Sequence, residues 1–572
     1  MTEASFMIGG EAGQGVQSLG QILSKIFARG GYHVYSDQDY ESRVRGGHNF
    51  FRIRTKDSEV GAINTSLDML LALNQESVDL HRNEMVDGGV VIFDKEKAPD
   101  LNGDGLFGIP LGELAEKEAG NKITANTVAL GACLALIKFD PKTAEILLQE
   151  TFDRKAGDAN VKALHSGYRF AKENFHKDYP ITLKDKGKSD MLLLNGNEAL
   201  ALGAIAAGCK FMAAYPMTPA SSILEFMAAR ARDMDLVVIQ PEDEIAAINM
   251  VVGAAFAGVR ALTATSGSGF CLMAEGLGLA GLTETPVVIV DAQRPGPAVG
   301  LPTRTEQGDL QFVLSAHHGD FPRAVLAPST VEEAFYLTVK AFNLAERYQI
   351  PMILLSDHLL ATSYQTIPEF DFRKVKIDRG ELYKTDRDYK PEDYKRHLIT
   401  KSGISPRAFP GMSEALVVTD SDEHGEDGHL IEDAGMRSNQ VEKRLRKYNS
   451  LRRDINLNSM YGASRPEISL ISWGSTYGAV REAVDILNGD GASVNMLQLS
   501  ELWPFPSKDV EDSLQKGQKT YVVEGNASGQ LARLIRAETG IKVDGLVLKY
   551  DGRPFTPNYL VERIKKGAIS TW

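Results

Sequence analysis

The chain has 572 residues, 43% of them hydrophobic and 24% charged, a length that corresponds to about three to five domains. Its 63 basic and 76 acidic residues give a net charge of −13, which argues against a nucleic-acid-binding surface, because such surfaces need clustered lysine and arginine. The three cysteines, Cys133, Cys209 and Cys271, have no CxxC spacing. The chain therefore offers neither a disulfide framework nor four thiolates for a cluster, and we expect a cytoplasmic location.

We expect neither a signal peptide nor a membrane span. The first residues, MTEASFMIGGEAGQG, pass from a short apolar strand into glycines without a basic region or a cleavable apolar segment. The most apolar stretch, residues 245–262, contains Asn249 and Arg260 and is shorter than the roughly 20 apolar residues that a span requires. A buried helix explains it better.

Changes in composition divide the chain into α/β domains. Residues 1–185 open as strand, glycine loop and helix and end in a charged stretch that indicates a linker. Residues 191–362 alternate apolar strands with Ala-rich helices, which predicts βαβ units on a parallel sheet. Residues 365–464 are charged and weakly periodic, so we expect an irregular excursion with one helix, VEKRLRKY. The alternation resumes over residues 465–572, a further α/β domain.

The first candidate site is the glycine loop that follows the first strand. Glycines such as Gly13 and Gly15 allow a tight turn and offer N–H groups and a helix N-terminus to an anion. A dinucleotide fingerprint would need a third glycine where Ser18 stands, although Asp37 lies where a ribose-binding acid would be expected. A turn that requires glycine only for packing explains the loop equally well.

A second glycine segment resembles a magnesium–diphosphate motif. Asn102-Gly103-Asp104-Gly105 is followed about twenty residues later by Asn126, as GDG and a distant Asn are in thiamine enzymes. Magnesium needs oxygens fixed at a strand end, whereas the preceding Pro99 to Leu101 indicates a surface turn. We therefore predict a turn.

The segment YPMTPASSI presents hydroxyl groups before a helix. Thr218, Ser221 and Ser222 stand at this helix entrance, where they can bind a carboxylate or cap the helix. Capping explains one of them. It does not readily explain Thr218, which lies between two prolines and is expected to point outward.

Three acids, Glu242, Asp243 and Glu244, precede the apolar helix IAAINMVVGAAFAG. The helix dipole favours acids in a first turn, which is sufficient to explain Glu242 and Asp243. Glu244 adjoins a segment too apolar to face solvent, so we expect its carboxyl to approach a buried surface and to share a proton. An aminopyrimidine cofactor needs such a carboxyl from its protein.

Further polar segments follow neighbouring strands. TATSGSG (263–269), DAQRPGP (291–297) and GLPTR (300–304) fall, like YPMTP, at or beyond carboxyl ends of strands, where open α/β sheets bind ligands. Arg294 can hold a carboxylate with its planar fork, although a structural ion pair is an equally simple explanation.

Together these motifs resemble the alpha subunit of 2-oxoacid:ferredoxin oxidoreductases, in the form with the gamma domain fused at the N-terminus. The resemblance rests on YPMTPASSI, QPEDEIAAI, TATSGSGF, DAQRPGPAVGLPTRTEQGD, SELWPFP and VVEGNASGQLARLIR, in one order over almost the whole chain. It implies a gamma-type domain over 1–185, a pyrimidine-binding domain over 191–362 and a transketolase C-terminal-like domain over 465–572.

The resemblance implies half of an active site. A separate beta subunit would hold the phosphates of thiamine diphosphate, Mg²⁺ and a [4Fe-4S] cluster, and this chain would hold the pyrimidine and no metal. Glu244 would bond to the pyrimidine ring, with Glu242 as the reserve candidate. Thr218 and Arg294 would bind the substrate's 1-carboxylate, and Thr303 would line the same cavity.

The remaining assignments concern ligands. Residues expected to line the cofactor are Tyr215, Pro216, Ser266 and Gly267, and those expected to assist coenzyme A are Gly13, Gly15 and Arg45. A solvated turn and a surface arginine explain the last group equally well.

The implied reaction is oxidative decarboxylation of a 2-oxoacid with coenzyme A and ferredoxin, in a dimer of alpha–beta heterodimers. The fused form and YPMTP favour 2-oxoglutarate over pyruvate or branched-chain 2-oxoacids. A distal carboxylate would then need a second cation, for which Arg304 and His317-His318 are candidates, unless the partner supplies it. An NAD-dependent dehydrogenase and a non-catalytic scaffold remain alternatives.

Overall fold

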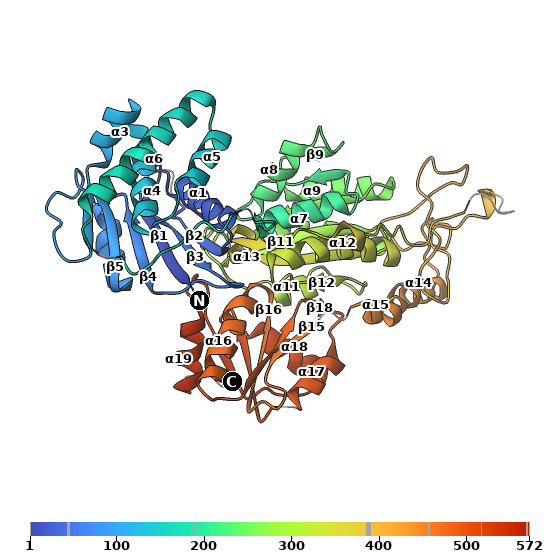
Figure 1. Cartoon of the computed structure of the whole chain (residues 1–572). Coiled ribbons are helices and arrows are strands. Elements are labelled where there is room, and N and C mark those ends of the chain that lie inside the picture. The colour runs from blue at the N-terminus through green and yellow to red at the C-terminus, as the bar shows by residue number, and fades with distance from the viewer. Residues whose placement is uncertain are drawn as a thin grey trace. The chain divides into compact units, whose positions relative to one another are not determined.

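The computed structural model describes residues 2–42, 46–177, 179–187, 189–384, 391–455, 458–515, 517–567 and 570. Contacts divide the chain into two compact units. The first comprises residues 1–194, 362–369 and 556–559, and the second comprises 195–361, 370–555 and 560–572. Both contain sheets covered by helices, which confirms the α/β class (Figure 1).

The first unit is built on a mixed sheet. Within the described residues the strand order is β6-β5-β4-β1-β3-β2-β14-β7. Its strands are β1 (Glu3–Glu11), β2 (His33–Asp39), β3 (His48–Lys56), β4 (Leu67–Ala72), β5 (Met85–Asp94), β6 (Leu106–Ile109), β7 (Leu192–Asn195) and β14 (Tyr364–Ile367). Its helices are α1 (Val16–Arg29), α2 (Gln75–His81), α3 (Leu111–Ala119), α4 (Ala125–Leu136), α5 (Lys142–Thr151) and α6 (Arg154–Asn174). Strands β1, β4, β5 and β6 are parallel, whereas β2 and β3 run antiparallel to their neighbours.

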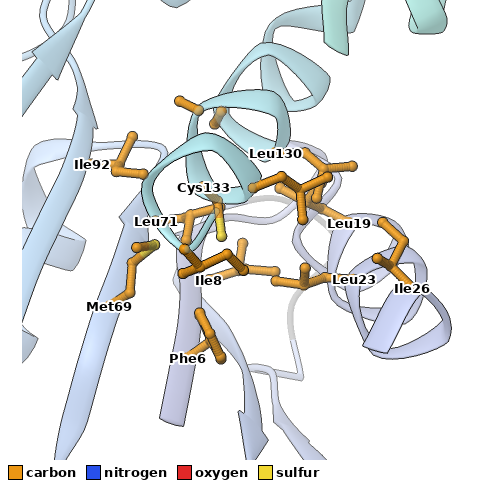
Figure 2. Packing of buried hydrophobic residues seen from close by; sticks show 14 of the residues in the cluster. Phe6, Ile8, Leu19, Leu23, Ile26, Met69, Leu71, Ile92, Leu130 and Cys133 are labelled. Carbon is orange, nitrogen blue, oxygen red and sulfur yellow. The ribbon is translucent and has the colours of Figure 1, made fainter. Parts of the chain in front are cut away.

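The core of this unit lies between the sheet and its helices. Side chains from β1, β4, α1 and α4 meet there, as Figure 2 shows for Ile8, Leu71, Leu23 and Cys133. The amphipathic face of α1 supplies Leu19, Leu23 and Ile26 at helical spacing, which is the pattern that anchors a helix to a sheet.

The second unit contains a largely parallel sheet with the order β18-β12-β13-β11-β10-β8-β9 in the described chain. The bounds are α7 (Gly196–Ala206), β8 (Phe211–Ala213), α8 (Ser221–Arg230), β9 (Val237–Ile239), α9 (Glu244–Phe256), β10 (Ala261–Thr265), α10 (Gly267–Leu282), β11 (Val287–Gln293), α11 (Leu310–Ser315), β12 (Ala324–Leu326), α12 (Val331–Tyr348), β13 (Pro351–Asp357), α13 (His358–Thr362) and β18 (Glu501–Trp503). Strands β10, β11 and β13 are buried throughout and apolar for most of their length, as expected of a sheet covered on both faces.

The same unit contains a smaller sheet with the order β15-β17-β16-β19-β20 over the described residues. Its elements are β15 (Asn458–Gly462), β16 (Ile468–Trp473), α16 (Tyr477–Gly489), β17 (Val494–Leu499), α17 (Ser507–Leu514), β19 (Lys519–Glu524), α18 (Gln530–Thr539), β20 (Gly545–Leu548) and α19 (Pro557–Lys565). Apolar residues of both sheets of the second unit belong to one buried cluster, which includes Ile353 and Trp473.

The excursion predicted over residues 365–464 is largely irregular in the described chain, but it contains regular elements that the prediction lacked. The predicted helix VEKRLRKY is the end of a longer helix, α14 (Ala434–Arg446), which is followed by α15 (Tyr448–Asp454). Strand β14, at the start of this region, pairs with β2 in the sheet of the first unit. A four-residue strand gives too short a pattern to be recognised from sequence. No helix of the described chain has the length and apolarity to cross a bilayer.

Candidate active site

Glu244 is the first residue of α9 and is almost completely buried, with 3% of its surface exposed. The Asp243 carboxylate caps the helix by accepting the Ala246 N–H at 2.8 Å, which leaves Glu244 free to turn toward α10. Its Oε1 is buried and has no hydrogen-bond partner in the described structure. A buried carboxyl oxygen without a partner is costly, so a ligand that hydrogen-bonded to Oε1 would remove that cost. The predicted burial of Glu244 is therefore confirmed.

Glycine at position 269 makes this placement possible. A Cβ there would lie 2.6 Å from Glu244 Oε1 and 2.1 Å from Thr265 Oγ1, closer than real contacts allow. The first turn of α10 therefore forms one wall of the Glu244 site. Glu242, the reserve candidate, is exposed and lacks this environment.

The YPMTP segment meets the loop after β11. The Arg294 guanidinium donates from Nη1 to the backbone carbonyl of Thr218 at 2.7 Å, and both residues are half-buried. Ser268 Oγ donates to Met217 Sδ at 3.3 Å, so the segment also contacts the start of α10. These residues follow β8, β10 and β11, so Thr218 and Arg294 come together at the predicted sheet edge.

The other residues expected to line the cofactor differ in exposure. Ser266 is fully buried and its Oγ lacks a partner among the residues described, whereas Tyr215 and Pro216 are exposed. Gly267 begins α10, where a Cβ would lie 2.5 Å from Asp309 Oδ2. At this edge of the sheet, Ser266 is a buried polar residue, whereas Tyr215 and Pro216 are exposed to solvent.

Three acidic residues of this region, Asp291, Glu306 and Asp309, have raised pKa values, and the sequence indicated no role for them. Burial, together with the neighbouring Asp309, raises the pKa of Asp291 well above its usual value. Burial raises the pKa of Asp309 to about 6 against the opposing effect of Arg294, and burial and Asp309 raise that of Glu306 to about 7. Asp309 lies eighteen residues after Asp291 along an irregular loop, so no sequence spacing indicated their proximity.

Thr303 and Arg304 occupy the loop between β11 and α11. Thr303 is buried, and Arg304 Nη1 donates to its carbonyl at 3.1 Å. Arg304 also packs against Gly552, and its charge contributes to the low pKa of His358, about 4, which burial mainly causes. Arg304 therefore lies beside the residue that follows β13.

The two histidines proposed as a distal cation lie elsewhere. A Cβ on Gly278 would lie 2.1 Å from His317 Nε2, and Gly278 is about 16 Å along α10 from Gly267. His318 stacks on His317, with ring centroids 4.1 Å apart. The histidines therefore lie toward the far end of α10 from Gly267, and their role as a distal cation stays a prediction without support from this placement.

The glycine loop of the first unit adopts the strained conformation that glycine permits. Gly13 and Gly15 have φ values of 93° and 76°, and Gly15 directly precedes α1. Space around Gly13 is open, whereas a Cβ on Gly15 would lie 2.6 Å from Asn126 Nδ2. Arg45 lies outside the described residues.

The topology of this unit does not fit a dinucleotide fingerprint. Asp37 lies on β2, which is antiparallel to β3, and its Oδ1 accepts a hydrogen bond from Arg52 Nε at 2.8 Å. A ribose-binding acid would instead end a parallel strand next to the first. The Asn102–Gly105 segment is a surface turn, as predicted, and exposed Asp104 pairs with Lys177.

Comparison with known proteins relates the chain to one family along most of its length. The family described as "Pyruvate flavodoxin/ferredoxin oxidoreductase, thiamine diP-bdg" matches residues 202–443. "Pyruvate ferredoxin/flavodoxin oxidoreductase" matches residues 5–170, and "Pyruvate:ferredoxin oxidoreductase core domain II" matches residues 466–560.

Individual relatives cover nearly the full chain. The 2-oxoacid:ferredoxin oxidoreductase subunit alpha of a Sulfolobus species is 34% identical, over 98% of this chain and 96% of its own. The 2-oxoglutarate synthase subunit KorA of Methanothermobacter thermautotrophicus is 34% identical over 65% of this chain and 98% of its own. The structure of 2-oxoglutarate:ferredoxin oxidoreductase from Magnetococcus marinus, with 2-oxoglutarate, coenzyme A and succinyl-CoA bound, has 33% identity, a TM-score of 0.92 and 99% coverage of both chains.

Proposed function

The chain belongs to the family of 2-oxoacid:ferredoxin oxidoreductase alpha subunits, and on this basis we propose that it decarboxylates 2-oxoglutarate oxidatively in complex with a beta subunit. The reaction converts 2-oxoglutarate, coenzyme A and two oxidised ferredoxins into succinyl-CoA, CO₂, two reduced ferredoxins and a proton, and it is reversible. The observation that carries the proposal is the buried, unpartnered carboxyl oxygen of Glu244.

The residues around Glu244 fit the pyrimidine half of thiamine diphosphate. A carboxyl that is buried at a strand-end edge and lacks a partner can donate to or accept from a ring nitrogen. Bound thiamine diphosphate supplies a carbon nucleophile and an electron sink. Glu244 would hold the proton at the ring nitrogen, and Ser266 Oγ, also unpartnered in the described residues, offers a second polar contact.

Thr218 and Arg294 form the proposed clamp for the substrate's 1-carboxylate. Their backbone-to-guanidinium hydrogen bond fixes the orientation of the fork, so less side-chain freedom is lost when substrate binds. Thr303 is proposed to line the same cavity. Arg304 is the proposed partner of the distal carboxylate that distinguishes 2-oxoglutarate from pyruvate and branched-chain 2-oxoacids.

The partner is proposed to cover α9 and α10. Ile245, Met250 and Leu272 are large apolar residues exposed on these two helices. Large apolar side chains exposed on two helices beside the Glu244 site are consistent with an interaction surface. The proposed beta subunit would bring the diphosphate site, Mg²⁺ and the [4Fe-4S] cluster that passes electrons to ferredoxin, in a dimer of heterodimers. A cytoplasmic location fits the three unpaired cysteines.

Coenzyme A is proposed to use the glycine loop of the first unit. Backbone N–H groups near Gly13 and Gly15 and the N-terminus of α1 suit a phosphate group, and the space around Gly13 is open. Arg45 remains a proposal from sequence alone.

The decisive experiment replaces Glu244 in the purified alpha–beta complex. Glu244→Gln keeps the shape of the side chain but removes its acid–base function, so 2-oxoglutarate-dependent reduction of ferredoxin should fall about 10²- to 10⁴-fold. Glu242→Gln is the matched control, because this neighbouring glutamate is exposed, and it should retain activity within about twofold.

Two further readouts separate the alternatives. If the Glu244→Gln complex assembles and retains full turnover, the chain is a scaffold and the proposal is wrong. Assaying the wild-type complex with 2-oxoglutarate, pyruvate and a branched-chain 2-oxoacid tests the substrate, and higher kcat/KM for pyruvate would overturn the choice of 2-oxoglutarate.

A further inference from the structure

The loop that carries Thr303 and Arg304 is hydrogen-bonded to the smaller sheet through Gln307, of which 2% is exposed. The Gln307 side chain donates from Nε2 to the Trp473 carbonyl at 2.9 Å. Its Oε1 accepts the Gly525 N–H at 2.8 Å. Trp473 ends β16 and Gly525 follows β19, and these two strands are parallel neighbours. One buried amide therefore bridges two strand ends of the smaller sheet.

The backbone of Gln307 makes a second connection to the same place. Its N–H donates to the Gly525 carbonyl at 2.7 Å, and its carbonyl accepts from Asn526 Nδ2 at 3.0 Å. Asn526 is itself fixed, because the same Nδ2 donates to Glu524 Oε2 at 2.7 Å. The Glu524 carboxyl is fully buried and also accepts the Leu531 N–H at 2.9 Å. The position of Gln307 is therefore set by groups that the smaller sheet holds rigidly.

Glycines on both sides enclose the Gln307 amide. A Cβ on Gly474 would lie 3.0 Å from Nε2, and a Cβ on Gly525 would lie 3.4 Å from Oε1. Gly474 has a φ of 56°, in the left-handed region that favours glycine. The next residue of the loop is held as well, because the Gly308 carbonyl accepts from Gln530 Nε2 at 2.6 Å. Little room remains for another position of the amide.

This anchor lies close to the residues proposed to bind substrate. Thr303 is only four residues before Gln307 in the chain. Further from the anchor, Val299 and Leu301 are exposed. Arg304 Nη1 bonds to the Thr303 carbonyl, so the two residues move together. A shift of Gln307 would therefore displace both Thr303 and Arg304.

We propose that Gln307 is a positioning residue through which the smaller sheet places Thr303 and Arg304, and with them the preference for substrates that carry a distal carboxylate. The proposal rests on the proposed function, in which Thr303 lines the substrate cavity and Arg304 binds the distal carboxylate. A loop that is held before binding loses less freedom when substrate arrives. Loss of the anchor therefore weakens binding of the distal group more than it slows the chemistry at C1.

The substitution Gln307→Glu tests the two side-chain hydrogen bonds directly. A protonated glutamate can reproduce them, because its O–H donates to the Trp473 carbonyl and its other oxygen accepts the Gly525 N–H. An ionised glutamate keeps the second bond, but it places a negative charge without a proton against the Trp473 carbonyl. Low pH should therefore restore the anchor in this variant, and high pH should break it.

Nearby titratable groups determine how the pH profile is read. Two buried carboxyls lie near position 307, Glu524 on β19 and Asp357 at the end of β13, and burial raises the pKa of both. Burial should raise the pKa of a glutamate at position 307 in the same way, so the high-pH measurement is made at pH 9. Glu306 and Asp309, in the same loop, have pKa values of about 7 and about 6. Each variant is therefore compared with wild type at the same pH.

The test measures steady-state kinetics of the purified alpha–beta complex at pH 6 and pH 9. At pH 9, Gln307→Glu should raise KM for 2-oxoglutarate about ten- to thirtyfold, as expected when hydrogen bonds that hold a buried anchor are lost. Its kcat should change less than about threefold, because binding rather than the transition state is affected. For pyruvate, which has no distal carboxylate, kcat/KM should change less than about threefold. At pH 6 all values should return to within about twofold of wild type.

Two further variants make the result specific. Gln307→Met keeps the length of the side chain but forms neither hydrogen bond, so its KM for 2-oxoglutarate should be raised at both pH values. Gln311→Glu is the matched control, because Gln311 is a half-buried glutamine of α11 whose side chain forms no hydrogen bond within the described residues. It should stay within about twofold of wild type. Hydrogen exchange of residues 298–309 without substrate should be faster in Gln307→Met.

The outcomes separate this proposal from the proposed function. If Arg304→Gln leaves the preference for 2-oxoglutarate over pyruvate unchanged, the proposed role of Arg304 is wrong. If Arg304→Gln abolishes the preference while Gln307→Met leaves KM for 2-oxoglutarate unchanged, only the present inference fails. Equal losses for both substrates, or a defect of Gln307→Glu that persists at pH 6, would show that Gln307 stabilises the fold without positioning the loop.

Discussion

Two buried glutamates of the second unit show opposite ways of placing a charge in a protein interior. Glu284 is fully buried just after α10 and lies among basic side chains: it pairs with Lys443 and, at 2.5 Å, with Lys447, and the His397 ring lies 3.0 Å away. Glu244 is buried almost as deeply, yet its Oε1 lacks a partner in the described structure. Lysines of the chain therefore pair with the first carboxylate, whereas no ion pair of the described residues involves the second.

The difference separates a structural role from a functional one. Burial alone would raise the pKa of Glu284, but Lys443 and Lys447 hold it well below its usual range, so the charge persists and fastens α14 to α10. A buried ion-paired network of this kind can specify one packing arrangement. A buried carboxyl oxygen without a hydrogen bond instead lowers the stability of the fold, and a ligand that binds to it removes this penalty.

The largest effect should come from breaking the satisfied cluster. Glu284→Gln leaves two buried lysines without a counter-charge and should destabilise the second unit by about 3–5 kcal/mol. Glu244→Gln removes no internal partner and should change stability by less than about 1 kcal/mol. Urea unfolding of both variants checks this prediction. Equal losses of stability would show that Glu244 stabilises the fold as much as Glu284 does.

A smaller effect should come from crowding the unsatisfied carboxyl. Gly269→Ala places a methyl group against Glu244 and Thr265 and should cost about 1–3 kcal/mol, with a loss of turnover larger than the loss of folded protein. Gly253→Ala, on α9, meets no neighbour within 4 Å and should stabilise the chain by about 0.5–1 kcal/mol. Thermal unfolding and ferredoxin reduction of both variants give the comparison. Unchanged turnover in Gly269→Ala would show that the position of Glu244 is unimportant.

The last effect concerns pH. Burial lowers the pKa of Lys447 to about 7, despite Glu284, whereas the unfolded chain should have the usual lysine value. The unfolded state then binds more protons between about pH 7 and 10, so stability should rise with pH there by up to about 1.4 kcal/mol per unit. Lys447→Met should lose this slope, as urea unfolding at pH 7, 8 and 9 would reveal. The same slope in both proteins would contradict it.

Structural features that depend on a local sequence pattern could be predicted from the sequence alone. Strong alternation predicted the α/β class and the main parallel sheet, and the abrupt change from acids to an apolar helix predicted that Glu244 is buried. The rule that the carboxyl ends of parallel strands lie at one edge of a sheet predicted that Thr218 and Arg294 are close, and the two residues are hydrogen-bonded. In each case the information lay in local patterns of strands, helices and strand ends.

Features that depend on distant pairing could not be predicted. Asp309 meets Gln293 across an irregular loop with no period. The partners of Glu284 lie about 110 to 160 residues further along, in an irregular segment and at the end of a helix whose charges resemble those of a solvated surface. Lys443 and Lys447 are spaced as neighbours on one helical face, but spacing does not tell whether that face is wet or buried. The role of Arg45 stays a prediction.

Strand β14 has a consequence for synthesis on the ribosome. The sheet of the first unit takes its β14 from residues 364–367, although most of that unit ends before residue 195. At 5–20 residues per second, roughly ten to forty seconds pass between emergence of the two parts. During that interval the outer edge of β2 has no β14 to pair with, so the nascent first unit is exposed to mispairing until translation has passed well into the second unit.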